Sequence, residues 1–357
     1  MNNWNHFAPP NSHAGIPKET RRRLKPAAAE PLMAPTVKPH PMQQFHDMLA
    51  AIKKANKVRP NRTGTDTIFL PGFMLKFDMA DGFPAITTKK LYFKPAKGEL
   101  LGFFRGYDNA AQFRAIDCKV WDGNANTTAS WLANPNRKGV DDLGRIYGKQ
   151  WTDWRDWREA KTQEAADALA AKGYELIAYD APRSTWVYRK GINQLEQALE
   201  AIMTTPTDRR ILITGWRPDE FDQMCIPPCH VDYQFLVDVQ TRTLHLCMFQ
   251  RSFDTFLAFN IALAALFLEI MAKLSGYTAG TFTHFIGDAH IYENHFQQTD
   301  LLLSREHKPQ PKLHLGASIP TLTSVDDIKG VFTRILPEDI ELIGYDSHPA
   351  IPAVMAA

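Results

Sequence analysis

Hydrophobic residues recur along most of the chain at spacings typical of regular secondary structure. Phe45, Met48, Leu49 and Ile52 are spaced as on one face of a helix, so the folded part is expected to begin near Gln43. Further helices are expected over residues 98–116, with an interruption at Gly106, and over 158–180, 190–203 and 260–274. Strands are expected over residues 67–77, 211–216, 231–237, 244–249 and 281–286, and a loop over 122–142. Strands and helices do not alternate strictly, which favours an α+β fold over a doubly wound sheet.

Two of the predicted helices have unusual compositions. Residues 260–274 are apolar nearly all round, which predicts a buried central helix closed by Gly276. Residues 158–180 are charged and rich in alanine, which predicts a helical insertion on the surface, with bounds near 155–190.

Residues 1–41 differ from the rest of the chain. They carry many of the 24 prolines and a basic cluster, Lys18, Arg21, Arg22, Arg23 and Lys25. Such a segment buries too little apolar surface to offset its ordering entropy, so a disordered tail is expected before a catalytic domain over 42–357. The alternative is an arm that docks weakly on nucleic acid or a partner protein.

The composition narrows the class of protein and its compartment. A net charge of +2 gives no reason to expect a nucleic-acid or membrane partner, and no run approaches the roughly 20 apolar residues of a membrane span. The first ten residues lack the apolar stretch of a secretory signal. The four cysteines are too few for a disulfide framework and match no zinc spacing, so we expect a cytoplasmic protein without a metal.

One cysteine stands in a context suited to nucleophilic chemistry. Cys229 follows Pro227-Pro228 and precedes His230, and Arg251 comes 22 residues later. A guanidinium near a thiol stabilises the thiolate, and the proline pair restricts the backbone before the sulfur. Taken alone, the pattern also fits a small buried core residue.

Several further segments, taken together, resemble the thymidylate synthase family. They occur in that family's order and span about residues 43–357: Asn61-Arg62-Thr63-Gly64-Thr65, Asp81-Gly82-Phe83-Pro84, Thr87-Thr88-Lys89, Asp142-Leu143-Gly144, Tyr147-Gly148-Lys149-Gln150-Trp151, Asp208-Arg209-Arg210, Pro228-Cys229-His230, Gln250-Arg251-Ser252 and Gly287-Asp288-Ala289-His290-Ile291-Tyr292. The resemblance implies an α+β fold with a large mixed sheet packed with helices, the sheet lying at a homodimer interface. It also implies reductive methylation of dUMP to dTMP, with 5,10-methylenetetrahydrofolate as cosubstrate and dihydrofolate as the second product.

The resemblance also assigns catalytic roles. Cys229 would add as a thiolate to uracil C6, which makes C5 nucleophilic. Glu99, in an apolar helical context, would be the acid/base group, because burial raises a carboxyl pKa. Tyr147 would help to remove the C5 proton, and Arg251 would lie beside the sulfur.

The binding residues follow from the same resemblance. The dUMP phosphate would be held by Ser252 and by the guanidinium forks of four arginines. Arg62 and Arg251 would come from one subunit, and Arg209 and Arg210 would reach across from the partner subunit. Asn260 would read uracil through an amide donor and acceptor, and His290 and Tyr292 would bind the ribose. Asp254 would serve both the substrate and the pterin, and the remaining folate contacts would be Lys89, Val120, Trp121, Leu257, Phe259 and Ala357.

The chain departs from the family pattern at three places. After Asp254 the usual Leu-Gly-x-Pro-Phe-Asn is replaced by Leu257-Ala258-Phe259-Asn260, which is two residues shorter. Asp66 stands where a second glycine is usual, and Arg145 where a proline is usual. The shortened segment leaves an alternative open, a 5-hydroxymethylase acting on dUMP or, as the weaker choice, on dCMP. An inactive nucleotide- or RNA-binding relative is a third class, against which the intact Cys229, Glu99 and Tyr147 argue.

Overall fold

The computed structural model describes residues 38–61 and 64–353 and divides the chain into two units, Met1–Pro39 and His40–Ala357. Most of the proposed tail, residues 1–41, lies outside the described residues, so its disorder stays a prediction. The elements below all belong to the second unit.

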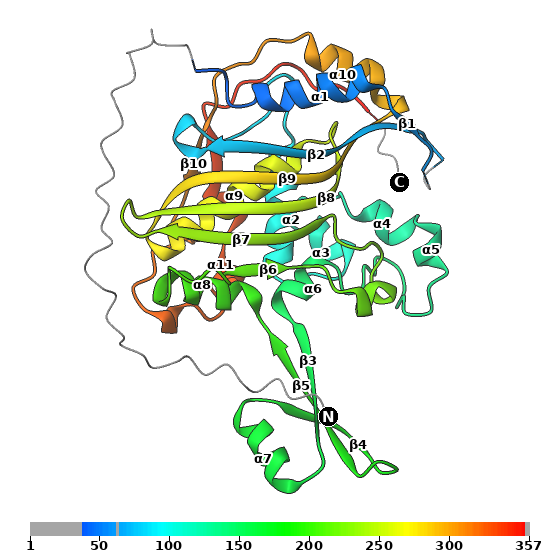
Figure 1. The fold of residues 1–357 in the computed structure, drawn as a ribbon, viewed down its shortest axis with the longest axis vertical. Coiled ribbons are helices and arrows are strands. Elements are labelled where there is room, and N and C mark those ends of the chain that lie inside the picture. Colours follow the sequence, from blue (N-terminus) through cyan, green and yellow to red (C-terminus); the bar gives the residue numbers. More distant parts are fainter. Residues whose placement is uncertain (1–37, 62–63, 354–357) are drawn as a thin grey trace, which may run out of the picture. The chain divides into compact units, whose positions relative to one another are not determined.

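A six-stranded mixed sheet forms the centre of this unit (Figure 1). Its strands, in spatial order, are β1 (Val58–Arg59), β2 (Thr67–Asp78), β9 (Thr278–Tyr292), β8 (Thr243–Asp254), β7 (His230–Asp238) and β6 (Leu212–Thr214). The β8–β9 pair is parallel and the other pairs are antiparallel. The predicted α+β class and large mixed sheet are confirmed.

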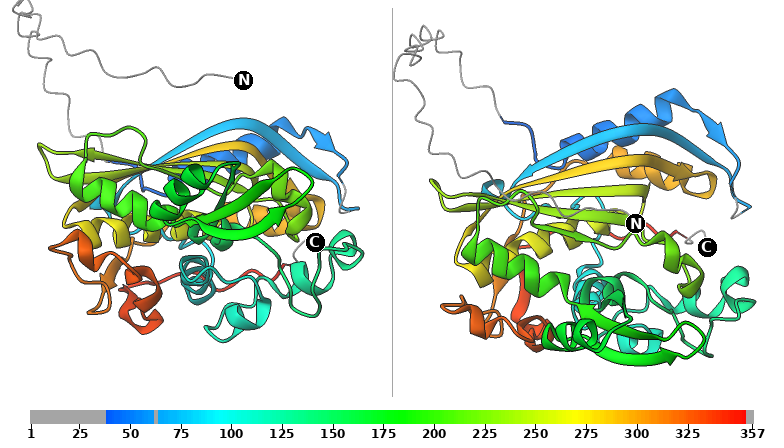
Figure 2. Two further views of the ribbon diagram at one scale, coloured as in Figure 1. Left: turned by 90° about the horizontal axis from the view of Figure 1, so that it is seen from below. Right: turned by 60° about the horizontal axis from the view of Figure 1, so that its bottom comes forward.

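Helices cover one face of the sheet and line its ends (Figure 2). They are α1 (Gln43–Ala55), α2 (Phe93–Phe104), α3 (Ala110–Arg114), α4 (Asp122–Asn126), α5 (Ala129–Leu132), α6 (Tyr147–Thr152), α7 (Gln163–Ala171), α8 (Gln194–Thr204), α9 (Phe259–Ser275), α10 (Phe296–Leu303) and α11 (Val331–Arg334). The expected central helix is α9, which is buried over most of its length and ends at Gly276 with a left-handed φ of 73°. Because α9 is apolar all round, it packs against the sheet on one side and α2 on the other.

The region around residues 158–180 corrects the sequence interpretation. It is mainly a three-stranded antiparallel sheet, β3 (Trp154–Ala160), β5 (Thr185–Ile192) and β4 (Glu175–Asp180), and only α7 is helical. This sheet extends from the main sheet as an arm (Figure 1) and has its own small apolar cluster around Tyr188. The alanine content indicated a helix. The flanking strands gave no competing signal, because β3 buries only Ala160 and β4 is almost fully exposed.

Other boundaries also differ from expectation. The predicted loop 122–142 contains the short helices α4 and α5. Residues 98–116 divide, as expected, near Gly106, which has a φ of 63° between α2 and α3. Two further strands, β10 (Lys312–Leu315) and β11 (Ile340–Ile343), form a separate antiparallel pair, and short 3-10 turns connect other elements, among them η3 (Pro218–Gln223).

Candidate active site

Cys229 directly precedes β7, and Arg251 on the neighbouring strand β8 fixes its position. The Arg251 amide on β8 donates to the Cys229 carbonyl at 2.9 Å. The Arg251 guanidinium donates to the carbonyls of Pro228 and Pro227 at 2.8 and 2.9 Å, and its Nη2 lies 3.9 Å from the Cys229 sulfur. Prolines have a carbonyl but no N–H, so this pair serves only as acceptors for the arginine. The pairing of β7 with β8 therefore brings Arg251 next to the Pro227-Pro228-Cys229 segment.

The other three cysteines have unfavourable surroundings for a nucleophile. Burial raises the pKa of both Cys118 and Cys225 to about 12, and burial also raises the pKa of Cys247. Cys229 is only partly buried and has a guanidinium beside it. The geometry thus favours Cys229 as the reactive thiol.

Two proton-carrying side chains converge near this thiol. Burial raises the pKa of Glu99 to about 8, with the Trp121 indole opposing part of the shift, so the carboxyl is mostly protonated at neutral pH. Burial also raises the pKa of Tyr147 well above its usual range. The Tyr147 hydroxyl accepts the Cys229 amide N–H at 2.6 Å, and its ring stacks on Phe103 at 4.8 Å between centroids. Both groups can therefore donate a proton close to the sulfur.

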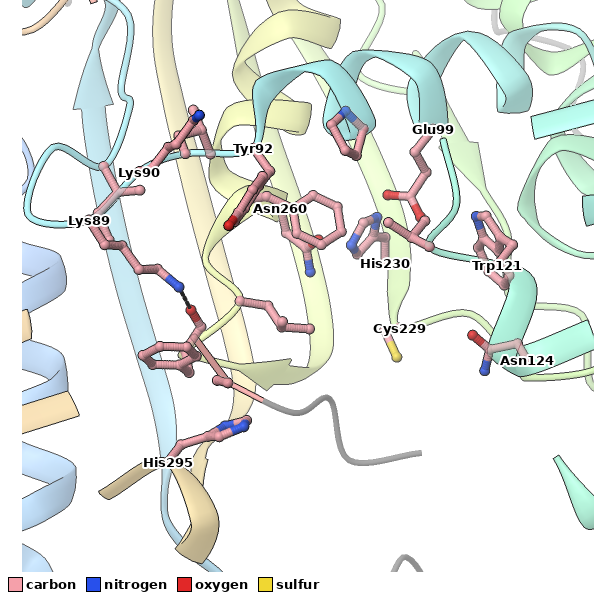
Figure 3. Close-up of a pocket in the computed structure, with 18 of the residues that line it drawn as sticks. Lys89, Lys90, Tyr92, Glu99, Trp121, Asn124, Cys229, His230, Asn260 and His295 are labelled. Carbon is pink, nitrogen blue, oxygen red and sulfur yellow. Dashed lines mark hydrogen bonds between the residues drawn. The ribbon is translucent and has the colours of Figure 1, made fainter. Parts of the chain in front are cut away.

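Two further polar side chains, His230 and Asn260, lie close to Cys229 and Glu99 (Figure 3). Burial lowers the pKa of His230 to about 4, which leaves the ring neutral, while a hydrogen bond with Asn260 works in the opposite direction. The His230 Nδ1 lies 2.9 Å from the Tyr233 hydroxyl. Asn260, the second residue of α9, is thus held beside a neutral ring and can present its amide to a ligand.

A cavity of about 510 Å³ opens beside these residues. Of the predicted site residues, it is lined by Lys89, Glu99, Val120, Trp121, Tyr147, Cys229, Leu257, Phe259 and Asn260. Its walls are mostly apolar, and Lys89 lies at one end, where its ammonium contacts the carbonyl and ring of Phe256. Burial lowers the pKa of Lys89 to about 8, and Asp254 opposes the shift.

The shortened segment Leu257–Asn260, which leads into α9, still presents side chains to the cavity. Leu257, Phe259 and Asn260 all line it. The backbone makes the connection by placing Ala258 in a left-handed conformation with φ 55° at the N-terminus of α9. A non-glycine residue there carries backbone strain, on the order of 1 kcal/mol. Two fewer residues are therefore accommodated by a tight turn.

The predicted substrate residues on β8 and β9 lie at the neighbouring strand ends and do not line the cavity. Asp254 pairs in register with His290, and Ser252 with Asp288. The His290 Nδ1 lies 3.2 Å from an Asp288 oxygen, and Asp288 is bonded by Arg59. The Tyr292 ring meets His290 edge-on at 5.2 Å. Asp254 accepts the Phe256 amide at 3.0 Å, and burial raises the pKa of Asp254.

Arg209 and Arg210 do not line the cavity beside Cys229. Arg209 and Arg210 border another hollow, of about 440 Å³, where Arg210 pairs with Asp208 at 2.8 Å. Arg62 and Ala357 lie outside the described residues.

Sequence reasoning assigned no role to several side chains that line the cavity: Ile86, Lys90, Leu91, Tyr92, Pro95, Phe103, Asn124, Ile226, His230, Phe256, His295, Ile351, Pro352 and Ala353. Some signals were available. Lys90 and Tyr92 directly follow Lys89, and Asn124 follows Trp121 by one helical turn. The segment 351–353 carries no local signal, because only the folded chain brings it to the cavity.

Comparisons with known proteins agree with the motifs. Residues 43–357 match the family model described as Thymidylate synthase. The thymidylate synthase of Pseudomonas syringae pv. tomato is 42% identical over 322 residues, covering 88% of this chain and 100% of the relative. That of Bordetella bronchiseptica is 43% identical over 323 residues with the same coverage, and that of Haemophilus influenzae is 38% identical over 315 residues, covering 87% of this chain and 98% of the relative.

Fold, site and comparisons define an α+β enzyme with a partly buried thiol at a mostly apolar cavity. The chain belongs to the thymidylate synthase family, whose members are folate-dependent methyltransferases. The recognition made from the sequence motifs is confirmed, and the comparisons support the synthase rather than the hydroxymethylase.

Two further observations concern the described residues alone. Within residues 38–61 and 64–353, no group of three or more His, Cys, Asp or Glu side chains could hold a metal ion. None of the helices in these ranges combines the length and apolarity needed to cross a membrane.

Proposed function

We propose that the enzyme converts dUMP to dTMP with 5,10-methylenetetrahydrofolate, through addition of the Cys229 thiolate to uracil C6. The observation that carries the proposal is the meeting of the Cys229 sulfur with the Arg251 guanidinium at 3.9 Å, at a cavity that also holds Glu99, Tyr147 and Asn260.

Each residue near the thiol has a task that follows from its surroundings. Arg251 favours the thiolate and contributes a charge for the nucleotide phosphate. Glu99, protonated at neutral pH, can donate toward the uracil O4 as negative charge develops on the ring. Tyr147, fixed by the Cys229 amide, is the group that assists loss of the C5 proton. Asn260 pairs with O4 and N3–H of uracil through its amide.

We assign the binding of the ribose and the phosphate of dUMP mainly to residues at the strand ends beside the cavity. His290 and Tyr292 bind the ribose, Asp254 serves the substrate and the pterin, and Ser252 joins the phosphate contacts. Arg62 completes the phosphate site from the same subunit. The Arg59–Asp288–His290 series supports the ribose assignment, because it fixes the imidazole orientation.

The apolar cavity fits the folate cosubstrate. A flat bicyclic ring with an aryl group suits walls formed by Val120, Trp121, Leu257 and Phe259, and Lys89 offers a cation for its anionic tail. When bound, the folate supplies the one-carbon unit and the hydride. The chain contributes the site that orients this group and excludes water, and Ala357 at the chain end would complete the cover.

We further propose that the enzyme is a homodimer with shared active sites. Support comes from a row of apolar side chains on the sheet: Met74 on β2 pairs with Phe285 on β9, which pairs with Phe249 on β8. These are 59%, 41% and 41% exposed, whereas their strand neighbours Leu75, Ile286 and Met248 are buried in the core. An apolar row across three strands suits a second copy of the sheet. Arg209 and Arg210, separate from Cys229 in one subunit, would then serve the partner's phosphate site.

The cysteines support a cytoplasmic location. No disulfide bond joins the four cysteines, which all lie within the described residues, as expected in a reducing compartment.

Product analysis tests the proposed function. The purified enzyme is incubated with dUMP and methylenetetrahydrofolate, the nucleotide product is identified by mass, and dihydrofolate is followed by absorbance. The proposal requires dTMP and dihydrofolate in equal amounts. 5-Hydroxymethyl-dUMP without dihydrofolate would favour the hydroxymethylase, and the absence of any nucleotide product would refute both.

A further inference from the structure

A buried cluster of polar and charged side chains joins α6 to η3. At its centre is Glu220 on η3, whose side chain is only 4% exposed. Arg145 donates from Nε to Glu220 Oε2 at 2.6 Å, and Gln150 donates to the same oxygen at 2.9 Å. Burial alone would raise the pKa of Glu220, but the bonds from Gln150 and Arg145 lower it below its usual range. Glu220 is therefore a buried carboxylate that depends on its partners.

Arg145 also binds the far end of helix α6. Its Nη2 donates to the Asp153 carbonyl at 2.6 Å, and its Nη1 donates to the Asp153 carboxylate at 3.1 Å. Asp153 is the C-terminal cap of α6, and Arg145 itself stands two residues before Tyr147, the first residue of that helix. Its guanidinium thus reaches along the whole helix and satisfies a carbonyl that has no partner within it.

The helix held in this way carries Tyr147. The Tyr147 hydroxyl accepts the amide of Cys229, while Glu220 lies on the segment that leads to Cys229. The same guanidinium therefore contacts the element before the thiol and the element that carries the hydroxyl. Only arginine has donors in a fixed fork that can make three such bonds at once.

We infer that Arg145 is a positioning residue for the reaction: by joining Glu220 to Asp153, it sets the Tyr147 hydroxyl relative to the Cys229 thiol. This inference rests on the proposed function, because it takes Tyr147 as the group that assists loss of the C5 proton. Arg145 does not line the cavity, so it acts on the reaction through α6.

Substitution of Arg145 removes only the side-chain bridge. The backbone link between the two segments remains, because the Arg145 amide donates to the Gln223 carbonyl at 2.8 Å and the Cys225 amide donates to the Leu143 carbonyl at 3.0 Å. Arg155 offers a matched control. It lies 3.6 Å from Glu220 and donates to Gln223 at 3.1 Å, but it does not bond the C-terminal carbonyl of α6.

The test combines steady-state kinetics with release of tritium from dUMP labelled at C5. The proteins compared are the wild type, Arg145→Gln, Tyr147→Phe, their double variant and Arg155→Gln. We expect Arg145→Gln to lower kcat and tritium release by about tenfold or more, since small misplacements of catalytic groups have effects of that size. The KM for dUMP should stay within about twofold, because phosphate and base contacts lie elsewhere.

The double variant separates positioning from general damage. If Arg145 acts through Tyr147, Arg145→Gln lowers the rate of Tyr147→Phe by less than about twofold. Equal losses in both backgrounds, an unchanged kcat in folded Arg145→Gln, or the same loss in Arg155→Gln would overturn the inference. If Arg145→Gln does not fold, Arg145→Lys, which keeps the charge but not the fork, is judged by the same criteria. A wild type without dTMP formation would instead refute the proposed function.

Discussion

The Arg251 guanidinium lies 3.9 Å from the Cys229 sulfur and is held there by the carbonyls of Pro227 and Pro228. The guanidinium also lies over the Trp216 indole, with 5.4 Å between the guanidinium carbon and the ring centroid. The arginine thus has a fixed position before any anion binds. A fixed cation near the sulfur is what a thiol needs in order to react at neutral pH.

Replacing Arg251 should therefore slow the reaction of the Cys229 thiol with an alkylating reagent. In Arg251→Gln, we expect alkylation of Cys229 by iodoacetamide at pH 7 to fall on the order of tenfold, because a nearby positive charge is lost. Mass spectrometry of the modified peptide measures the rate for Cys229 alone. Cys229→Ser protein provides the background from the other cysteines. An unchanged alkylation rate would show that the guanidinium does not influence the thiol.

Asn260 should determine the choice of base. It lies in the cavity beside the neutral His230, where its amide can match uracil. Asn260→Asp should lower kcat/KM for dUMP by on the order of 100-fold or more and raise acceptance of dCMP, since an unpaired polar group in a buried site is costly. Competition between dUMP and dCMP measures the preference. A mutant with wild-type preference would mean that the shortened segment has moved Asn260 away from the base.

Subunit mixing tests the shared active site. Arg209→Ala and Cys229→Ser proteins should each be inactive, and a hybrid dimer should contain one site with all of its parts. After the two proteins are mixed under conditions of proven subunit exchange, we expect up to about a quarter of the wild-type activity for random pairing. No recovery would exclude a role for Arg209 across the interface.

Four of the candidate site residues could be predicted from the sequence because each of them stands in a short, distinctive segment. Cys229, Glu99, Tyr147 and Asn260 each sit in a recognisable motif or an apolar helical context, and all four line the cavity. The long apolar α9 was predictable for the same reason, since burial all round leaves a continuous pattern.

What the sequence could not reveal depends on contacts between distant segments. The arm strands β3, β4 and β5 bury only Ala160, Thr185 and Tyr188, so they carry no regular alternating pattern, and local composition favoured a helix instead. The bridge from Arg145 to Glu220 joins residues 75 positions apart, and residues 351–353 reach the cavity only in the folded chain. In the sequence, Arg145 was visible only as a departure from the family pattern.

The ionisation of Glu99 should appear in the pH dependence of kcat. Its pKa is raised to about 8, so the carboxyl is protonated below that pH and loses its proton above it. If Glu99 acts as the proton donor, kcat should decline above pH 8. In Glu99→Gln, the rate should be lower by about 10²-fold or more, and this decline should be absent. A wild-type profile that stays level through pH 9 would contradict the assignment.

Acid should destabilise the protein through a stack of three histidines. The His307 ring lies 4.3 Å from the His40 ring and 4.2 Å from the His46 ring, and both His307 nitrogens are buried without a hydrogen-bond partner. Burial lowers the pKa of His46 and of His307 to about 4, and the nearby Asp47 opposes the shift in both. As the pH falls, these histidines therefore bind protons in the unfolded chain before they do so in the folded protein. Their contribution to the unfolding free energy is complete above about pH 6.5 and is lost as the pH drops toward 4.

His307→Phe keeps an aromatic ring in the stack but cannot titrate. Between pH 7 and pH 5, we expect the wild type to lose on the order of 1 kcal/mol more unfolding free energy than this variant, a value reduced for the partial exposure of the site. Urea unfolding at each pH measures the difference, with His314→Phe as a control on an exposed histidine outside the stack. Carboxylates and other buried histidines titrate in both proteins and cancel in the comparison. Parallel losses in the wild type and His307→Phe would mean that the stack does not govern acid stability.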